Sequence, residues 1–199
     1  MYNNSLIVTM ASISLDLGCG QFPRNPFNCT EVVGIDIAQQ NWTCQEKKFS
    51  LGGLTLIQHD IILHPLPFES GAIDFVTAYD FLEHVPRCII KNEKIHNCFI
   101  QLMDEIFRVL KGGGLFHKTP CAPHKFSFVD PTHLNHVTEK TMYYFCGQFL
   151  DEARKSVNEV FEVSRSYGIK SEFVLIWSEL SANHGHLMQH LRKPLVALK

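Results

Sequence analysis

The sequence has no excess of positive charge and no run of more than two basic residues. Its 18 lysines and arginines face 20 aspartates and glutamates, so the net charge is −2 with neutral histidines. Proteins that bind nucleic acids or anionic membranes usually carry a basic patch or stripe. The composition therefore gives no strong signal for a nucleic-acid or membrane partner.

Long hydrophobic runs are also absent from the N-terminal region. The opening residues, MYNNSLIVTMASIS, contain no basic stretch, and their apolar run covers only Leu6 to Val8. This run is too short for a signal peptide or a membrane-spanning helix. We expect a cytoplasmic protein without a membrane segment.

Closely spaced cysteine pairs are missing as well. Structural zinc sites usually need such pairs, so no framework of the zinc-finger kind is expected. An odd number of cysteines fits reduced thiols better than a set of disulfides. The sequence contains seven, at Cys19, Cys29, Cys44, Cys88, Cys98, Cys121 and Cys146.

Internal repeats, low-complexity tracts and Gly/Ser linkers are absent, so we expect residues 1–199 to form a single domain. Short apolar runs bounded by glycine, proline or aspartate recur along the chain, as buried parallel strands do. We expect the last two of these runs to form an antiparallel hairpin. The predicted strands are 13–17, 32–37, 54–58, 72–79, 115–120, 160–169 and 171–180.

Two segments between the strands favour helices. Residues 95–110 place apolar side chains on one stripe, and the KGGG that follows is typical of a helix end. Residues 138–153 suit a second helix, and Glu83 and His84 fit the first turn of another. Strands that alternate with helices predict a mostly parallel α/β sheet with both faces covered.

The stretch Asp16-Leu17-Gly18-Cys19-Gly20 follows the first predicted strand. Its two glycines allow a sharp turn that lies close to a ligand. A dinucleotide site would have a third glycine where Pro23 stands, followed by a helix that binds pyrophosphate. Pro23 and Pro26 leave little room for that helix, and Asp16 suits a cationic ligand better. An NAD-dependent oxidoreductase is therefore the less favoured interpretation.

Two further carboxylates follow predicted strands. Asp36 ends the second strand, where a carboxylate can bind both hydroxyls of a ribose or cap a helix. Asp60 follows the third strand, where it can accept a hydrogen bond from an adenine amino group or stabilise a turn. Each residue thus has a ligand-binding and a structural interpretation.

These features occur in the order found in a known family. The segments LDLGCG, VVGIDI, QHDI, PLPFESGAIDFVTAYDFLEHV and LMDEIFRVLKGGGLFHKTP resemble successive motifs of class I S-adenosylmethionine-dependent methyltransferases, especially the small type 11-like group. The resemblance covers about residues 13–120. It implies a Rossmann-like, doubly wound, mostly parallel seven-stranded sheet of order 3-2-1-4-5-7-6 with one antiparallel edge strand.

The resemblance also implies that S-adenosyl-L-methionine is the cofactor. It assigns the methionine moiety to the Asp16–Gly20 turn, the ribose to Asp36 and the adenine to Asp60. Residues 120–150 match the family less well, so we expect a substrate-side insertion there. The implied cofactor-binding residues are Asp16, Gly18, Cys19, Gly20, Asp36, Ile37, His59, Asp60, Tyr79 and Asp80.

Four of the 11 histidines lie within twenty residues that begin in the fifth predicted strand and also contain Asp130: His117, His124, His133 and His136. Histidine is a natural general base near neutral pH, so His117, His133 and His136 are our candidates for catalysis or substrate binding. The same residues also suit a plain structural loop. A metal site that adds Cys121 is a third interpretation, but magnesium favours carboxylates, and we predict no metal.

The predicted function is therefore methyl transfer from S-adenosylmethionine to a small-molecule acceptor, with an oxygen nucleophile favoured by the histidines. Amino-methylating DNA enzymes of this fold carry a proline pair where this chain reads Ala78-Tyr79-Asp80-Phe81. The alternative is a non-catalytic cofactor-binding module or partner subunit of the same fold. Neither the identity of the acceptor nor an oligomeric state is predicted.

Overall fold

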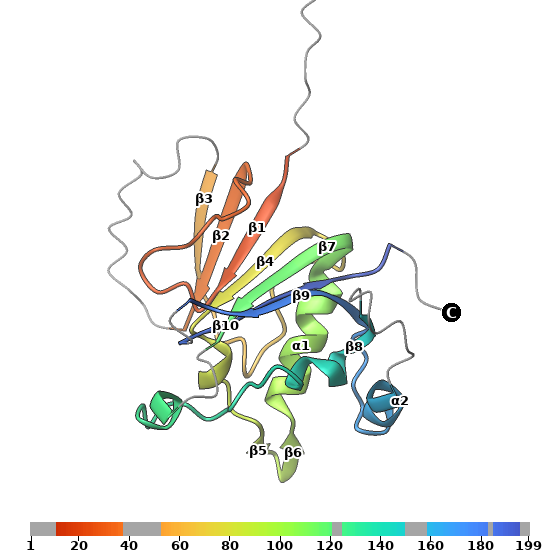
Figure 1. Ribbon diagram of the computed structural model, residues 1–199. Helices are drawn as coiled ribbons and strands as arrows, with labels where there is room; N and C mark the ends of the chain where they lie inside the picture. The colour runs from red at the N-terminus through yellow and green to blue at the C-terminus, as the bar shows by residue number, and fades with distance from the viewer. Residues whose placement is uncertain (1–10, 38–52, 121–124, 150–158, 183–184, 196–199) are drawn as a thin grey trace, which may run out of the picture.

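The computed structural model describes residues 11–37, 53–120, 125–149, 159–182 and 185–195. Its centre is an eight-stranded sheet (Figure 1). The strands of this sheet are β1 (Ile13–Leu17), β2 (Glu31–Asp36), β3 (Gly53–Gln58), β4 (Ile73–Tyr79), β7 (Leu110–Thr119), β8 (Cys146–Phe149), β9 (Phe173–Leu180) and β10 (Leu187–Arg192). The remaining elements are the hairpin β5 (Ile89–Lys91) and β6 (Lys94–His96), the helices α1 (Cys98–Val109) and α2 (Glu159–Ser166), and 3₁₀ turns at Leu82–His84, Lys125–Phe128 and Thr141–Phe145.

The order of the strands confirms the predicted fold class. It runs β3-β2-β1-β4-β7-β10-β9-β8, and its first seven places reproduce the order 3-2-1-4-5-7-6 when β7, β9 and β10 count as strands five, six and seven. β10 is antiparallel to both neighbours, β7 and β9, so the antiparallel strand lies inside the sheet. β8 pairs parallel with β9 and adds an eighth strand that was not predicted.

The predicted strand 160–169 is wrong, because most of this segment forms α2. Phe161 and Ser164 are buried three residues apart, which is the spacing of one helix face. Gly168 follows the helix with a φ of 82°, and its N–H donates to the carbonyl of Arg165, as at a glycine-terminated helix end. β9 is therefore left without the predicted hairpin partner.

The actual partner of β9 is β10, which the sequence interpretation overlooked. Leu187, Gln189 and Leu191 are buried and alternate with more exposed residues. This period of two is the signature of a strand. The hairpin therefore closes through residues 181–186, later in the chain than predicted.

The predicted helix 138–153 is also wrong over its described part. A single 3₁₀ turn, Thr141–Phe145, leads directly into β8. Gly147 lies in the middle of this strand, and a glycine costs a helix about 1 kcal/mol relative to alanine. A Cβ at this position would lie 2.8 Å from Oε1 of Glu172, so the glycine also allows a close approach to that side chain.

Helix α1 follows the predicted stripe but is shorter at both ends. Ile95 belongs to β6, and the helix passes into β7 at Leu110 without a glycine cap. The glycines of KGGG lie inside β7, where Gly113 has a φ of 83° and donates its N–H to the carbonyl of Lys193. They therefore shape the start of a strand and do not end the helix.

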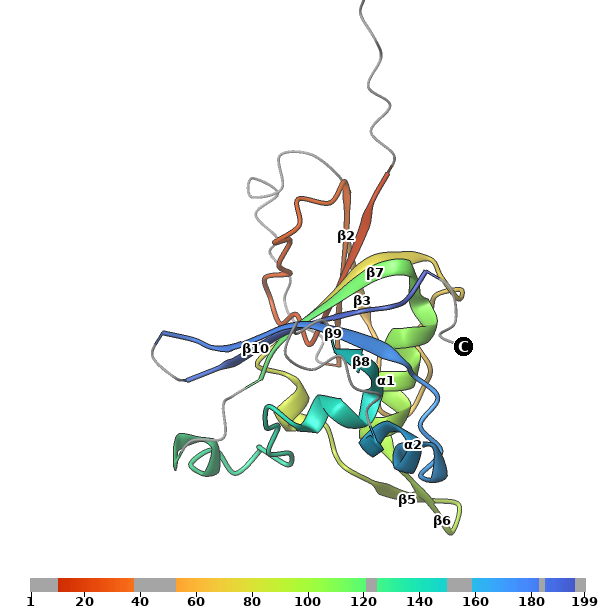
Figure 2. The ribbon, with the colours of Figure 1, turned by 45° about the vertical axis from the view of Figure 1, so that its right-hand side comes forward.

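The two helices lie on the same side of the sheet, and the loop 18–30 lies on the other (Figures 1 and 2). Phe107 of α1 packs edge-on against Phe173 of β9, with ring centroids 4.9 Å apart. On the opposite face, Phe27 of the loop stacks on Phe75 of β4 at 4.4 Å. Among the described residues, helices therefore cover one face, whereas the sequence predicted helices on both.

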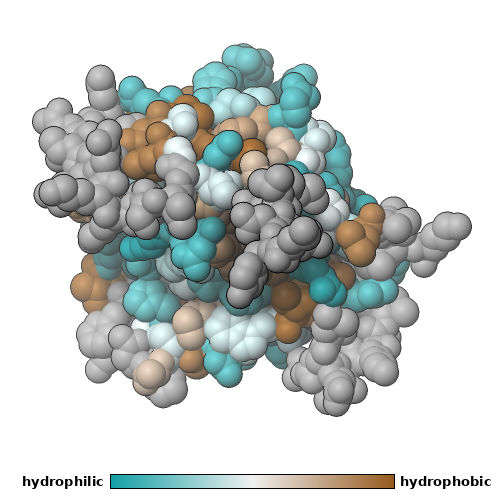
Figure 3. Space-filling model, turned by 90° about the horizontal axis from the view of Figure 1, so that it is seen from above, coloured by the Kyte–Doolittle hydropathy of each residue, from teal (hydrophilic) through white to brown (hydrophobic). Residues whose placement is uncertain are grey.

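The surface and the thiols can be compared with what the composition suggests. Seen from above, hydrophobic residues form small patches separated by hydrophilic ones (Figure 3). None of the helices in the described ranges is long and apolar enough to cross a membrane. The cysteines within those ranges are all free thiols: Cys19, Cys29, Cys88, Cys98 and Cys146.

One lysine of the central sheet has its side chain in the core. Lys118 of β7 is fully buried, and its Nζ has no hydrogen-bond partner among the described residues. Burial lowers its pKa from 10.5 to about 7, and the charges of Cys146 and Glu83 partly oppose this shift. In the unfolded chain this lysine keeps its proton up to a higher pH than in the folded protein. Its contribution to the free energy of unfolding therefore increases as the pH rises from about 7 to 10.5.

We expect Lys118→Met to stabilise the protein at pH 7, because it removes a buried ammonium and keeps the volume. Replacements of buried charged groups by apolar ones commonly gain about 1–4 kcal/mol. The gain should shrink as the pH is raised towards 10, and urea unfolding at several pH values measures it. Lys94→Met, at an exposed site on β6, is the matched control and should change the free energy of unfolding by less than about 0.5 kcal/mol. A destabilised or pH-independent Lys118→Met would contradict this account.

Candidate functional site

A cavity of about 370 Å³ opens at the carboxyl ends of β1 to β4. These strands are parallel and in register, so their last residues meet at one edge of the sheet, where open α/β sheets bind ligands. Six predicted cofactor-binding residues line it: Gly18, Asp36, Ile37, His59, Asp60 and Asp80. The rest of the lining is Ile35, Ile61, Ile62, Phe81, His84 and Val85.

The glycine turn borders this cavity in a conformation that only glycine adopts easily. Gly18 and Gly20 have φ angles of 61° and 56°. A Cβ on Gly18 would lie 2.3 Å from Cδ2 of Phe81, so no side chain fits there. The N–H of Gly20 donates to Oδ2 of Asp36 at 2.9 Å, and the N–H of Cys19 donates to the carbonyl of Ile35 at 3.1 Å. The turn and the Asp36 carboxylate therefore hold each other in place.

Asp16 lies behind the cavity and does not line it. Its side chain is buried, and its oxygens accept hydrogen bonds from Oγ1 of Thr77 at 2.6 Å and from the N–H of Arg24 at 2.8 Å. Burial raises the pKa of this carboxyl to about 6, although both hydrogen bonds and the Arg24 charge act in the opposite direction. Asp16 thus changes its charge in mildly acidic solution.

Asp60 and His59 both take part in the turn after β3. Oδ1 of Asp60 accepts the N–H groups of Ile62 at 2.9 Å and Leu63 at 3.1 Å. Nε2 of His59 donates to the carbonyl of Pro65 at 2.9 Å. The turn-stabilising role that the sequence allowed for Asp60 is therefore present, and the same carboxyl lines the cavity.

Tyr79 and Asp80 lie where β4 ends. Asp80 has a φ of 46°, and its Oδ1 is 2.9 Å from Nε2 of His186, in the β9–β10 connection. The guanidinium of Arg24 lies 4.3 Å from the centre of the Tyr79 ring. Burial raises the pKa of the Tyr79 phenol, so this side chain stays neutral. Asp80 lines the cavity. The Tyr79 ring lies instead on the face of the sheet that carries the loop 18–30, where it contacts His117.

The three candidate histidines do not come together in one site. His117 lies on the sheet, 4.7 Å from His190, and its pKa is lowered to about 4 by burial and by the nearby positive charges of His190 and Lys118. His133 packs against His84, with ring centroids 4.9 Å apart. His136 stacks on Phe128 at 4.2 Å and lines a second cavity. The other proposed metal ligands, His124 and Cys121, lie outside the described residues.

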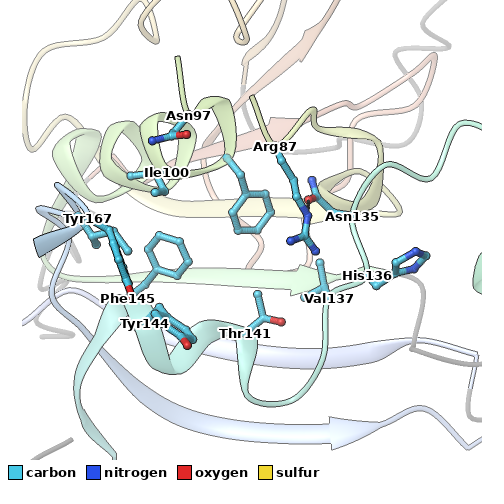
Figure 4. A pocket seen from close by; sticks show the side chains of 12 residues that line it. Arg87, Asn97, Ile100, Asn135, His136, Val137, Thr141, Tyr144, Phe145 and Tyr167 are labelled. Atoms are coloured by element: carbon cyan, nitrogen blue, oxygen red, sulfur yellow. Dashed lines mark hydrogen bonds between the residues drawn. The ribbon is translucent and has the colours of Figure 1, made fainter. Parts of the chain in front are cut away.

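This second cavity measures about 430 Å³ and lies between the start of α1 and the segment 135–145. Arg87 and Asn135 face each other at one end, where Nε of Arg87 donates to Oδ1 of Asn135 at 3.0 Å (Figure 4). Aromatic and aliphatic side chains form most of the remaining wall. The residues that line it are Arg87, Asn97, Phe99, Ile100, Asn135, His136, Val137, Thr141, Tyr144, Phe145, Tyr167 and Ile169.

Sequence reasoning missed several residues that line the two cavities or that support Asp16 behind the first one. Phe81 and His84 follow β4 directly, so their place at the ligand-binding edge was available as a signal. Thr77 was hidden inside an apolar strand. Arg87 and Asn135 are joined only by the fold, and no spacing in the sequence relates them.

Comparison with known proteins decides the family. The family described as a methyltransferase domain matches residues 15–117, which is 103 of the 199 residues. The chain belongs to the class I S-adenosylmethionine-dependent methyltransferases. The resemblance of its motifs is therefore confirmed, S-adenosylmethionine is its cofactor, and the NAD-dependent interpretation is not supported. No curated protein matches the chain by sequence.

Solved structures show the same fold at low sequence identity. The [4+2]-cyclase SpnF is 17% identical with a TM-score of 0.59, covering 96% of this chain and 77% of its own. A methyltransferase from Methanosarcina mazei is 14% identical with a TM-score of 0.54, covering 94% and 95%. The N-methyltransferase NodS from Bradyrhizobium japonicum, in complex with S-adenosyl-L-homocysteine, is 13% identical with a TM-score of 0.53, covering 92% and 78%.

The chemistry of the first cavity fits this cofactor. S-adenosylmethionine carries a sulfonium and an ammonium group, and a ribose with two hydroxyls. Three carboxylates, Asp36, Asp60 and Asp80, line the cavity, and its described lining contains no lysine or arginine. Such a lining suits a cationic, hydroxylated ligand and disfavours a pyrophosphate.

We expect the affinity for S-adenosylmethionine to fall as the pH is lowered through about 6, because protonation of Asp16 removes a negative charge beside the cavity. Calorimetric titrations between pH 5 and 8 measure this loss, which is limited to about tenfold per pH unit. Asp16→Asn should bind weakly at all pH values and show less pH dependence. Any dependence left in that variant comes from other groups, and an unchanged pH profile would exclude Asp16 as its cause.

We expect Gly18→Ala to weaken both the fold and cofactor binding. A left-handed conformation costs a residue with a side chain about 1–2 kcal/mol, and the new methyl group would also collide with Phe81. Thermal unfolding and calorimetric titration with S-adenosylmethionine give the two losses. Gly53→Ala is the matched control, since nothing lies within 4 Å of an added Cβ there. Equal behaviour of the two variants would refute the role of the turn.

Proposed function

We propose that this methyltransferase transfers the methyl group of S-adenosylmethionine to a hydroxyl oxygen of a small molecule held in the second cavity. The observation that carries the proposal is that one short segment borders both cavities. His84 and Val85 line the first cavity, and Arg87 lines the second. An acceptor in the second cavity would therefore lie next to the cofactor, as direct transfer requires.

The walls of the second cavity support a small acceptor with an apolar body. A volume of about 430 Å³ is within the usual range for small-molecule sites. Tyr144, Phe145 and Tyr167 gather at one end of the cavity, and the polar groups of Arg87 and Asn135 lie at the other (Figure 4). This division suits an aromatic or similarly flat molecule that carries a polar group. It also supports our proposal that the segment around 120–150 forms the substrate side of one domain.

His136 is the proposed general base. Its ring is among the groups that line the second cavity, and its buried Nδ1 has no hydrogen-bond partner among the described residues. A rotation of the ring would present this nitrogen to an acceptor, with the ring hydrogen on Nε2. The bound cofactor supplies an activated methyl group on its sulfonium. His136 would accept the proton of the acceptor hydroxyl as the methyl group is transferred to its oxygen. The chain otherwise contributes by holding the two reactants in line.

The test is the formation of S-adenosyl-L-homocysteine from S-adenosylmethionine with a panel of hydroxylated aromatic compounds. We expect turnover with at least one of them, and a loss of about 100-fold or more in kcat for His136→Gln. Calorimetry should show unchanged cofactor affinity in this variant. By contrast, Asp36→Ala should lower cofactor affinity, because it removes the carboxylate at the end of β2.

The controls separate the proposal from its alternatives. His96→Gln, on β6 and outside both cavities, should keep the full kcat. Cofactor binding without turnover on any acceptor would favour a non-catalytic binding module of the same fold. Turnover on amines alone, unaffected by His136→Gln, would replace the oxygen nucleophile by nitrogen and dismiss His136 as the base.

A further inference from the structure

Two histidines and a glutamate meet between the two cavities. Glu83 and His84 belong to the 3₁₀ turn after β4, and His133 belongs to the segment that follows Lys125–Phe128. One potential ligand atom from each lies within 4.8 Å of the other two. Ligands of one zinc ion lie about 3.4 Å apart, given bond lengths of about 2.1 Å. A small inward movement of the side chains would therefore let them share an ion.

The hydrogen bonds of both imidazoles leave the same ring nitrogen available. Nδ1 of His133 lies 2.9 Å from the carbonyl of Ser127, which can only accept, so Nδ1 carries the hydrogen. Nδ1 of His84 lies 3.0 Å from Oγ1 of Thr132. That hydroxyl already donates to Asp130 at 2.6 Å and so accepts from His84. Each ring thus keeps a lone pair on Nε2, with Nδ1–H fixed as in most metal-binding histidines.

A negative charge lies beside one of these lone pairs. Oδ1 of Asp130 accepts the hydrogen bonds of Thr132, whereas Oδ2 lies 3.7 Å from Nε2 of His133. A lone pair and a carboxylate oxygen at this distance attract a cation between or beside them. The carboxyl of Glu83 is buried and lies in the same cluster.

The backbone holds the two ligand-bearing segments together. The carbonyl of Glu83 accepts the N–H groups of Leu134 at 2.7 Å and Asn135 at 2.9 Å. The side-chain amide of Asn135 donates to the carbonyls of Leu82 and Val85. Because these bonds fix the segments on both sides of the cluster, the three side chains are pre-organised to bind together.

We propose that Glu83, His84 and His133 bind one divalent transition-metal ion of the zinc class and leave at least one coordination position open. Two imidazoles and one carboxylate are a ligand set typical of such ions when three protein ligands are used, and nitrogen ligands disfavour magnesium and calcium. Lys118 competes with the ion, since its charge acts on Glu83 from the core. The proposal does not depend on the acceptor chemistry proposed above.

The test is a calorimetric and optical titration of the full chain with Co²⁺ after treatment with a chelator. Blocking the thiols first prevents the cysteines from binding the metal. We expect one equivalent of Co²⁺ to bind with visible absorption, and Zn²⁺ to displace it. His133→Gln should weaken binding at least about 100-fold, and His96→Gln should not change it. Equal binding by both variants, or none by the folded wild-type chain, would overturn the proposal.

A second variant keeps all three ligands and alters only their support. Thr132→Val removes the hydroxyl that accepts from Nδ1 of His84, so we expect metal affinity to fall by about 10–100-fold. Circular dichroism checks that the fold is retained. Metal held at an unrelated surface site would not respond to this change, so an unaltered affinity for Co²⁺ would also count against the site. Methyl transfer is not measured in either experiment, so the outcome is separate from that of the proposed function.

Discussion

The buried carboxylate of Asp16 joins three parts of the chain that surround the first cavity. It belongs to β1, and it accepts hydrogen bonds from Thr77 in β4 and from the backbone of Arg24 in the loop 18–30. Because no helix connects β1 to β2, these bonds replace part of the packing that a crossover helix would supply. The arrangement leaves a carboxyl with a pKa of about 6 directly behind the site of a cationic ligand.

The same loop shapes the site through its aromatic and proline residues. Phe27 stacks on Phe75 and so anchors the loop to the sheet face that carries no described helix. A Cβ on Gly34 would lie 2.6 Å from Cγ of Pro23, so the loop passes close above β2. The position of the glycine turn, and with it the bond from Gly20 to Asp36, follows from this close packing.

The lining of the first cavity was largely predictable from the sequence because it depends on a simple rule. Glycines and carboxylates that follow parallel strands must meet at one edge of the sheet. The second cavity and the histidines near it follow no such rule. His117 and Lys118 are neighbours in β7 but point to opposite faces, and His133 reaches His84 only because Asn135 ties its segment to the turn after β4.

The errors in secondary structure have a related origin. The segment 160–169 is as apolar as a strand, and only the burial of Phe161 and Ser164 on one side shows its helical period. In β10 the burial of the side chains has a period of two, but one of the buried residues is the polar Gln189. Its amide donates to Oγ of Ser178 and to the carbonyl of Glu139, so the sequence hides the period. Apolar content alone therefore predicts a strand at 160–169, where a helix forms, and misses the strand β10.

The charges around the first cavity also bear on product release. Methyl transfer converts the sulfonium of the cofactor into a neutral thioether, while Asp36, Asp60 and Asp80 keep their places in the lining. For a cofactor bound in the first cavity, these carboxylates would attract the sulfonium more strongly than the thioether, which favours exchange after each turnover. A metal ion at Glu83, His84 and His133 would act in the opposite direction, since its positive charge repels the sulfonium more than the thioether. Metal occupancy would thus be coupled to the preference for cofactor over product through His84, which lines the first cavity and belongs to the proposed metal site.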